Sequence, residues 1–121
     1  MALSNPGGRS PFVLTVEHAG RAVPASLGDL GVSAAEMERH IAWDIGAAAL
    51  GEALSALLDA PLLLQPYSRL VIDCNRPFAA PDLIPAVSDG TPVPANRGLD
   101  AAARRQRFEE IHQPFHCAVT A

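Results

Sequence analysis

The chain has 121 residues, of which 49% are hydrophobic and 18% charged, a balance typical of one globular domain or part of a larger one. This composition argues against a disordered chain, and no apolar run approaches the length of a membrane span. The formal net charge of −4 argues against a nucleic-acid-binding surface, which needs a basic patch. We therefore expect a soluble cytoplasmic protein that binds neither nucleic acid nor membrane.

The first predicted element is a β-strand over residues 12–16, which ends in a charged pair. Glu17 and His18 follow the strand directly, and Gly20 allows the backbone to turn sharply. In open α/β sheets, ligands gather beyond the carboxyl ends of the strands. A carboxylate and an imidazole at such an end therefore indicate a functional site, although a lone histidine is more often structural.

A long helix is predicted from residue 33 to about residue 58. Ser33 and Glu36 match a capping box at its start. Within this helix His40 and Asp44 stand four residues apart and therefore share a face. The pair fits either a surface hydrogen bond or an imidazole and a carboxylate offered to a metal or a substrate.

A buried β-strand is predicted at residues 70–72, because a short apolar run rich in β-branched residues suits a sheet covered on both faces. Four polar residues flank this run: Arg69, Asp73, Asn75 and Arg76. Polar groups at a buried strand end must be paired, and the arginine fork of donors suits a carboxylate. We predict a binding site for an acidic small molecule here; the alternative is an Arg–Asp pair that only fixes the strand end.

The remaining predicted elements are a strand at residues 62–65, a long loop after residue 78 and a last helix. Loops of this length usually bind a ligand or are disordered. Asp100 is expected to cap the helix and Pro114 to interrupt it. The order of elements predicts an α/β fold with at least one parallel strand pair. Because three strands make a thin sheet and the chain stops soon after Pro114, we expect residues 1–121 to form a single, incomplete domain.

Three ordered motifs resemble the N-formylglutamate amidohydrolase family, and the resemblance covers nearly the whole chain. The motifs are EHAG with VP within residues 17–24, HIAWDIGA at 40–47 and YSRLVIDCNRP at 67–77, and SDGT at 88–91 and PFH at 114–116 also fit. The Asp-x-Asn-Arg element at 73–76 is also similar to that of zinc-carboxypeptidase and aspartoacylase-like hydrolases.

The resemblance implies a three-layer α/β/α fold of the phosphorylase/hydrolase type, of which this chain would be the N-terminal part. It implies zinc-assisted hydrolysis of an N-acylated acidic amino acid such as N-formyl-L-glutamate, a reaction of histidine catabolism.

The resemblance makes His18 the first metal ligand. Related carboxypeptidases place a glutamate three residues later, where this chain has Arg21, so the second ligand is open among Glu17, His40 and Asp44. Family members carry a further ligand in a later His-Ser motif, and this chain stops before it. Because a catalytic zinc usually keeps three protein ligands, we expect the visible set to be one ligand short.

The resemblance also implies roles for the polar residues of the second half of the chain. Arg69 would act on the polarised carbonyl or the substrate carboxylate, and Asp73 would orient an arginine. The residues expected to contact the anionic substrate are Asn75, Arg76, Ser88 and Asp89.

Three hypotheses follow. The chain is a metal-dependent amidohydrolase or its N-terminal portion; it is a truncated, non-catalytic relative that binds a small anionic ligand; or it assembles with a separate chain that carries the missing half. An incomplete sheet leaves an edge and an apolar surface open, so the isolated chain is expected to self-associate.

Overall fold

The computed structural model describes residues 1–120, which form a mixed α/β unit. Its elements are short, and irregular segments join them. In chain order they are β1 (Ala2–Ser4), β2 (Leu14–Val16), η1 (Ala25–Leu27), α1 (Ala34–Met37), α2 (Ala47–Leu58), β3 (Leu62–Leu64), β4 (Val87–Ser88), β5 (Thr91–Pro92), η2 (Pro94–Asn96), α3 (Ala101–Arg107), η3 (Phe108–His112) and α4 (Gln113–Thr120).

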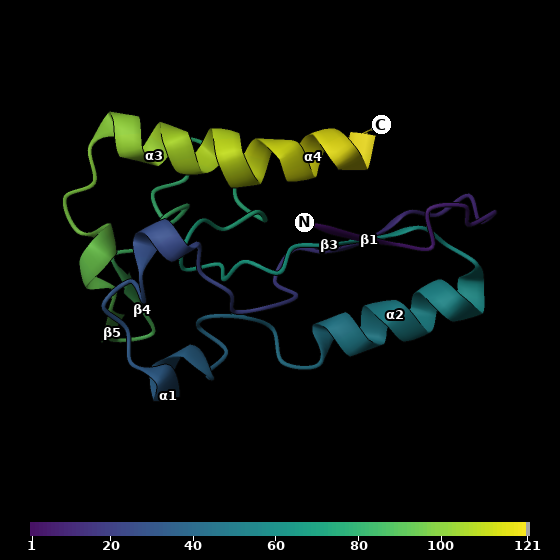
Figure 1. Cartoon of the computed structure of the whole chain (residues 1–121), viewed down its shortest axis with the longest axis horizontal. Helices are drawn as coiled ribbons and strands as arrows, with labels where there is room; N and C mark the ends of the chain where they lie inside the picture. Colours follow the sequence, from purple (N-terminus) through teal and green to yellow (C-terminus); the bar gives the residue numbers. More distant parts are fainter. Residues whose placement is uncertain (121) are drawn as a thin grey trace.

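The central sheet has three strands in the order β1-β3-β2. β2 runs parallel to β3, as predicted, whereas β1 runs antiparallel to it and lies in a segment expected to be a loose lead-in. α2 covers one face of the sheet, and α3, η3 and α4 form a continuous rod over the other (Figure 1). We call residues 101–120 the C-terminal rod. The carboxyl ends of β2 and β3 therefore lie between two helical layers.

The predicted long helix over residues 33–58 is wrong, because an irregular segment, 38–46, separates α1 from α2. The Ser33 cap is present, with its Oγ accepting a hydrogen bond from Glu36 N at 3.2 Å. The backbone then leaves the helix because it bonds to distant segments: Ser68 Oγ donates to Ala42 O at 2.8 Å, and Asp44 N donates to His18 O at 3.0 Å. His40 and Asp44 therefore share no helix face.

The predicted strand at residues 70–72 is also wrong, although these side chains are buried as expected. The backbone turns here, and Val71 N donates to Ser68 O at 3.0 Å. Two side chains bond to the buried carbonyls: Asn96 Nδ2 donates to Leu70 O at 2.7 Å, and Arg107 Nη1 donates to Val71 O at 2.9 Å. Buried carbonyls need partners, so these side chains replace the neighbouring strands of a sheet.

The C-terminal rod does not end at Pro114, contrary to the prediction. Asp100 caps α3 as expected, with Oδ1 accepting from Ala103 N at 2.8 Å. The rod then widens into the π-helical turn η3, in which Gln113 N donates to Phe108 O. Pro114 follows this π-helical turn directly and is the second residue of α4.

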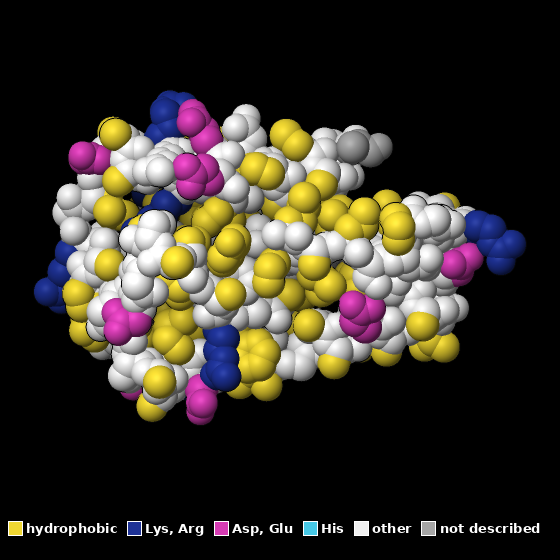
Figure 2. Space-filling model, viewed as in Figure 1, with side chains coloured by type: hydrophobic (Ala, Val, Ile, Leu, Met, Phe, Trp, Pro, Cys, Tyr) yellow, Lys and Arg dark blue, Asp and Glu magenta, His cyan; other side chains and the backbone are white. Residues whose placement is uncertain are grey.

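Apolar side chains are distributed unevenly between the interior and the surface. Hydrophobic side chains gather along the middle of the face shown in Figure 2, between the C-terminal rod and α2, and further ones lie on α2. Ile45 is 67% exposed and Leu57 is 82% exposed. No helix within residues 1–120 is long and apolar enough to cross a membrane.

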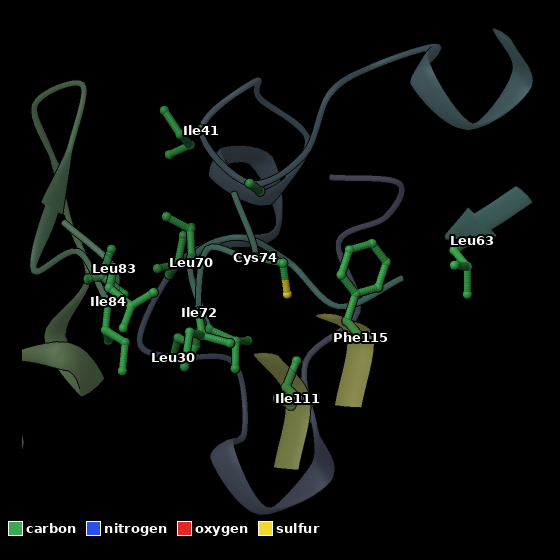
Figure 3. Packing of buried hydrophobic residues seen from close by; sticks show 14 residues of the cluster. Leu30, Ile41, Leu63, Leu70, Ile72, Cys74, Leu83, Ile84, Ile111 and Phe115 are labelled. Carbon is green, nitrogen blue, oxygen red and sulfur yellow. The ribbon is translucent and has the colours of Figure 1, made fainter. Parts of the chain in front are cut away.

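The core is built around the irregular segment that carries Leu70, Ile72 and Cys74. Ile111 and Phe115 reach this segment from the C-terminal rod (Figure 3). All five side chains are buried. The polar residues beside this segment are consequently held by a packed interior, not by a sheet.

Candidate functional site

A buried imidazole lies between two carboxylates at the centre of the site. His18 Nε2 is 2.6 Å from Asp73 Oδ1, and His18 Nδ1 is 3.2 Å from Asp44 Oδ2. Arg69 joins the two carboxylates, because its Nη1 donates to Asp44 Oδ1 at 3.1 Å and its Nη2 is 3.5 Å from Asp73 Oδ2. Four residues singled out in the sequence therefore lie together, and we call them the His18 cluster.

Local backbone contacts place His18 at the carboxyl end of β2, where the sequence predicts it. Ala19 N donates to Gln65 O at 3.1 Å, which continues the pairing of the two parallel strands. The chain then passes close to the segment after β3: a Cβ added at Gly20 would lie 2.5 Å from Pro66 O. Only glycine allows this approach, so Gly20 fixes the turn that follows the site.

Asp73 lies opposite His18 because the segment after Ile72 turns around its carboxylate. Asn75 N donates to Asp73 Oδ1 at 2.9 Å, and Asp73 N donates to Leu83 O at 2.8 Å. A side chain that bonds to the backbone two residues later forms an Asx-turn. Asp73 is therefore held by its own turn as well as by His18.

The electrostatics of this pair favour the charged forms of both groups. Burial acts to lower the pKa of His18, but the hydrogen bond and charge of Asp73, with the hydrogen bond of Asp44, outweigh it and raise the pKa above its ordinary value. Burial acts to raise the pKa of Asp73, but the hydrogen bonds from His18 and Asn75 N and the nearby positive charges hold it below its ordinary value. The buried pair is therefore an imidazolium and a carboxylate at mildly acidic pH.

A pocket of about 250 Å³ opens beside the His18 cluster. Arg69 and Asp73 contribute to its wall, together with three residues expected to contact substrate. Its full lining is Ile41, Arg69, Leu70, Asp73, Arg76, Asp82, Pro85, Val87, Ser88 and Asp89. Asn75 is not among these residues; it is exposed and lines a different pocket, with His112 and His116.

Asn75 and Arg76 form a pair of neighbouring residues that are both exposed to solvent, and the Arg76 side chain is 43% exposed. The reason is that no strand precedes the pair: the chain turns outward after Asp73. Arg76 Nε donates to Asp82 Oδ2 at 3.1 Å. Within residues 1–120 no hydrogen bond involves its two Nη groups, which leaves them for an anionic ligand.

Ser88 and Asp89 reach the pocket from a tight hairpin between β4 and β5. Asp89 has φ 46° and Gly90 has φ 78°, the positive pair required by a type I′ turn. Arg39 holds this hairpin, since Nη2 donates to Asp89 Oδ2 at 3.0 Å and Nη1 donates to Thr91 Oγ1 at 2.8 Å. The sequence does not indicate this role for Arg39, because its partners lie about 50 residues further along the chain.

His40 and Glu17, two of the three alternatives for a second metal ligand, make their contacts outside the His18 cluster. The His40 side chain is 69% exposed, and its Nε2 lies 3.5 Å from Asp89 Oδ2. Glu17 Oε1 accepts from Thr15 Oγ1 at 2.7 Å. The third alternative, Asp44, is the one that contacts His18.

Two side chains of the cluster fit a shared metal ion. A tetrahedral zinc with ordinary bond lengths holds a nitrogen and an oxygen ligand roughly 3.4 Å apart, close to the 3.2 Å between His18 Nδ1 and Asp44 Oδ2. Asp73 contacts the other ring nitrogen of His18, Nε2. A carboxylate in this position commonly orients a metal-bound histidine. Within residues 1–120, however, no group of three or more His, Cys, Asp or Glu side chains could hold a metal ion.

Comparisons with known proteins agree with the motifs. The family model described as N-formylglutamate amidohydrolase matches residues 10–121. Among solved structures, the chain is similar to the crystal structure of gene product Atu2144 from Agrobacterium tumefaciens, with 39% sequence identity and a TM-score of 0.95. This match covers 98% of the present chain and 47% of that chain, so the present chain spans about half its length. No curated protein matches.

Proposed function

Because the chain belongs to the N-formylglutamate amidohydrolase family, we propose that it provides the anion-binding pocket and part of the metal site of a metal-dependent amidohydrolase. The substrate is an N-acylated acidic amino acid such as N-formyl-L-glutamate. Residues 1–121 belong to one domain of the three-layer α/β/α phosphorylase/hydrolase type. The observation that carries the proposal is the His18 cluster, which shares Arg69 and Asp73 with the pocket.

Arg76 and Ser88 are the residues that bind the substrate's carboxylate. The free Nη groups of Arg76 can donate a pair of charge-assisted hydrogen bonds to one carboxylate. Arg69 is already engaged by Asp44 and Asp73, so it acts mainly by fixing those two carboxylates.

The charge of the pocket supports a role for a cation. Its charged lining consists of Arg69, Arg76, Asp73, Asp82 and Asp89, a formal net charge of −1. An anionic substrate would be repelled from a pocket of negative net charge. A divalent cation beside the pocket would make the net charge of the site positive. The proposed cation, zinc by family resemblance, would therefore assist binding as well as catalysis.

His18 and Asp44 would hold this metal ion, with Asp73 orienting His18. A bound metal ion polarises an amide carbonyl and lowers the pKa of bound water. Asp73 keeps the imidazole ring fixed through Nε2, and Arg69 keeps the Asp44 carboxylate in place. Arg69 would neutralise the second carboxylate oxygen of Asp44, Oδ1, if the first were a metal ligand.

The test is calorimetric titration of the 121-residue chain with N-formyl-L-glutamate, with and without zinc, and with N-formyl-L-glutamine as the control ligand. We expect the glutamate derivative to bind more tightly, and Arg76→Met to weaken its binding about tenfold or more, because a charge-assisted pair of hydrogen bonds is lost. The matched control is Arg97→Met, an exposed arginine outside the pocket. Equal binding of the two ligands, or an unaffected Arg76→Met variant, would refute the proposal.

A second candidate function is non-catalytic binding of a small anion. It is favoured by the lack of a complete metal-binding group within residues 1–120. Elemental analysis of chelator-free protein distinguishes the two candidates. Metal that is present in the wild type and lost in His18→Ala supports the amidohydrolase, whereas ligand binding that is independent of zinc supports the binding protein.

A further inference from the structure

A buried positive charge lies where the C-terminal rod packs on the core. Arg107 is 6% exposed, and its Nη1 donates to Val71 O at 2.9 Å and to Asn96 Oδ1 at 2.7 Å. Both acceptors are neutral. Burial lowers the pKa of the Arg107 guanidinium, and no carboxylate within residues 1–120 forms an ion pair with it. Since buried charges are normally paired, Arg107 is a candidate partner for an anion.

The free donors of Arg107 form one edge of the guanidinium. Within residues 1–120 its hydrogen bonds come from Nη1, which leaves Nε and Nη2 without partners. These two groups are not sealed in the interior, because His112 Nδ1 is the one fully buried side-chain nitrogen or oxygen without a partner in the described part of the chain. Parallel N–H donors on one edge of a guanidinium match the two oxygens of a carboxylate.

A pocket of about 240 Å³ reaches Arg107 between η1 and the C-terminal rod. We call it the Arg107 pocket, and its lining is Pro24, Ser26, Leu27, Leu99, Ala103, Gln106, Arg107, Glu110 and Ile111. It shares no residue with the pocket beside the His18 cluster. Sites for drug-sized ligands usually measure roughly 300–1,000 Å³, so the Arg107 pocket suits a smaller molecule.

The charge and polarity of the lining restrict the kind of anion. Glu110 is the second charged residue of the Arg107 pocket, which gives a formal net charge of zero. It is exposed, and its Oε1 accepts from Gln106 Nε2 at 3.0 Å. A dianion such as phosphate would leave an uncompensated negative charge, whereas a single carboxylate balances Arg107. The apolar walls, which include Leu27, Leu99 and Ile111, favour a hydrocarbon body on this carboxylate.

We propose that the Arg107 pocket binds a small aliphatic monocarboxylate. Its carboxylate accepts from Nε and Nη2 of Arg107, and its hydrocarbon chain packs against Leu27, Leu99 and Ile111. The exposed hydroxyl of Ser26 can donate a further hydrogen bond. The site is separate from the His18 cluster, so this proposal depends on neither the metal ion nor the N-acyl amino acid substrate.

The test is titration of the 121-residue chain with hexanoate, followed by the NMR signals of the arginine Nε–H groups, with neutral hexanamide as the control ligand. We expect hexanoate to shift the Arg107 signal in a saturable way and hexanamide to leave it in place. Gln106→Glu should weaken hexanoate binding about threefold or more, because a second carboxylate beside the pocket repels the anion. The matched control is Gln113→Glu, an exposed glutamine of the same rod outside the pocket, which should keep the wild-type affinity.

Two further variants test the charges directly. Glu110→Gln should tighten hexanoate binding about threefold, because it removes the negative charge of the lining. Arg107→Gln should abolish binding; if this variant does not fold, the surface variants Gln106→Glu and Glu110→Gln decide the question. Four outcomes would overturn the proposal: no saturable shift at Arg107, an equal shift with hexanamide, a shift confined to Arg76, or equal affinity in Gln106→Glu and Gln113→Glu. In the first of these cases Arg107 serves the core alone.

Discussion

Replacing Asn96 by alanine should destabilise the chain more than any exposed substitution near the site. The Asn96 side chain is buried and donates from Nδ2 to Leu70 O at 2.7 Å and to Pro85 O at 2.8 Å. Its Oδ1 accepts from Arg107 Nη1 at 2.7 Å. Asn96→Ala removes all three hydrogen bonds at once.

The magnitude follows from the groups that are left without partners. Leu70 O and the Arg107 guanidinium lie in the buried part of this network, whereas the bond to Pro85 O is only partly buried. Each buried polar group left unsatisfied costs about 1–3 kcal/mol, so we expect a loss of about 3 kcal/mol in the free energy of unfolding. Domains are stable by about 5–15 kcal/mol, and the loss is therefore a large share of the total.

The assay is urea unfolding followed by the fluorescence of Trp43, the single tryptophan, with circular dichroism as a second probe. With a slope of about 1.5 kcal/mol/M, a loss of 3 kcal/mol lowers the midpoint by about 2 M. The matched control is Asn75→Ala, an exposed asparagine that should stay within about 0.5 kcal/mol of the wild type. If Asn96→Ala is equally mild, side chains do not replace a sheet ladder at residues 70–72, and the argument fails.

Three further predictions address the site and the cysteines. The raised pKa of His18 stabilises the metal-free fold below pH 6.5, and this contribution is lost as pH rises through the folded pKa. Burial lowers the pKa of His112, which acts in the opposite direction, so the measurement is the difference in unfolding free energy between wild type and His18→Gln. This difference should shrink from pH 6 to pH 8, and an increase would contradict the prediction. Arg39→Met should release the β4–β5 hairpin, seen as faster amide exchange at residues 87–91, while Arg97→Met should not. Equal exchange in both variants would remove Arg39 from this role. Burial raises the pKa of the Cys74 thiol to about 11. Iodoacetamide at neutral pH should therefore modify the exposed Cys117 and leave Cys74 intact, as measured by peptide mass spectrometry. Modification of Cys74 in the folded chain would refute its burial.

Much of the site could be predicted from the sequence, because its residues lie at recognisable chain positions. His18 follows an apolar strand, and the structure places it at the end of β2. Arg69 and Asp73 flank an apolar run, and they lie beside His18 as the motifs suggest. The roles of these residues as metal ligands and substrate contacts stay predictions.

The elements around the site were harder to predict, because distant contacts decide them. Helical periodicity extends through residues 38–46, yet hydrogen bonds to His18 and Ser68 draw this segment out of the helix. A β-branched run suggests a strand at residues 70–72, yet Asn96 and Arg107 bond to its carbonyls instead. Local patterns carry no information on partners so far along the chain.

The dependence of residues 70–72 on later side chains sets the order in which the site can form. The partners of Leu70 O and Val71 O come 26 and 36 residues later. At about 5–20 residues per second, the ribosome needs roughly two to seven seconds to add 36 residues. During this interval the apolar segment next to Arg69 and Asp73 cannot reach its final conformation, so the site is completed only after α3 has been synthesised. Until then the apolar side chains of residues 70–72 lack the contacts that bury them in the finished fold.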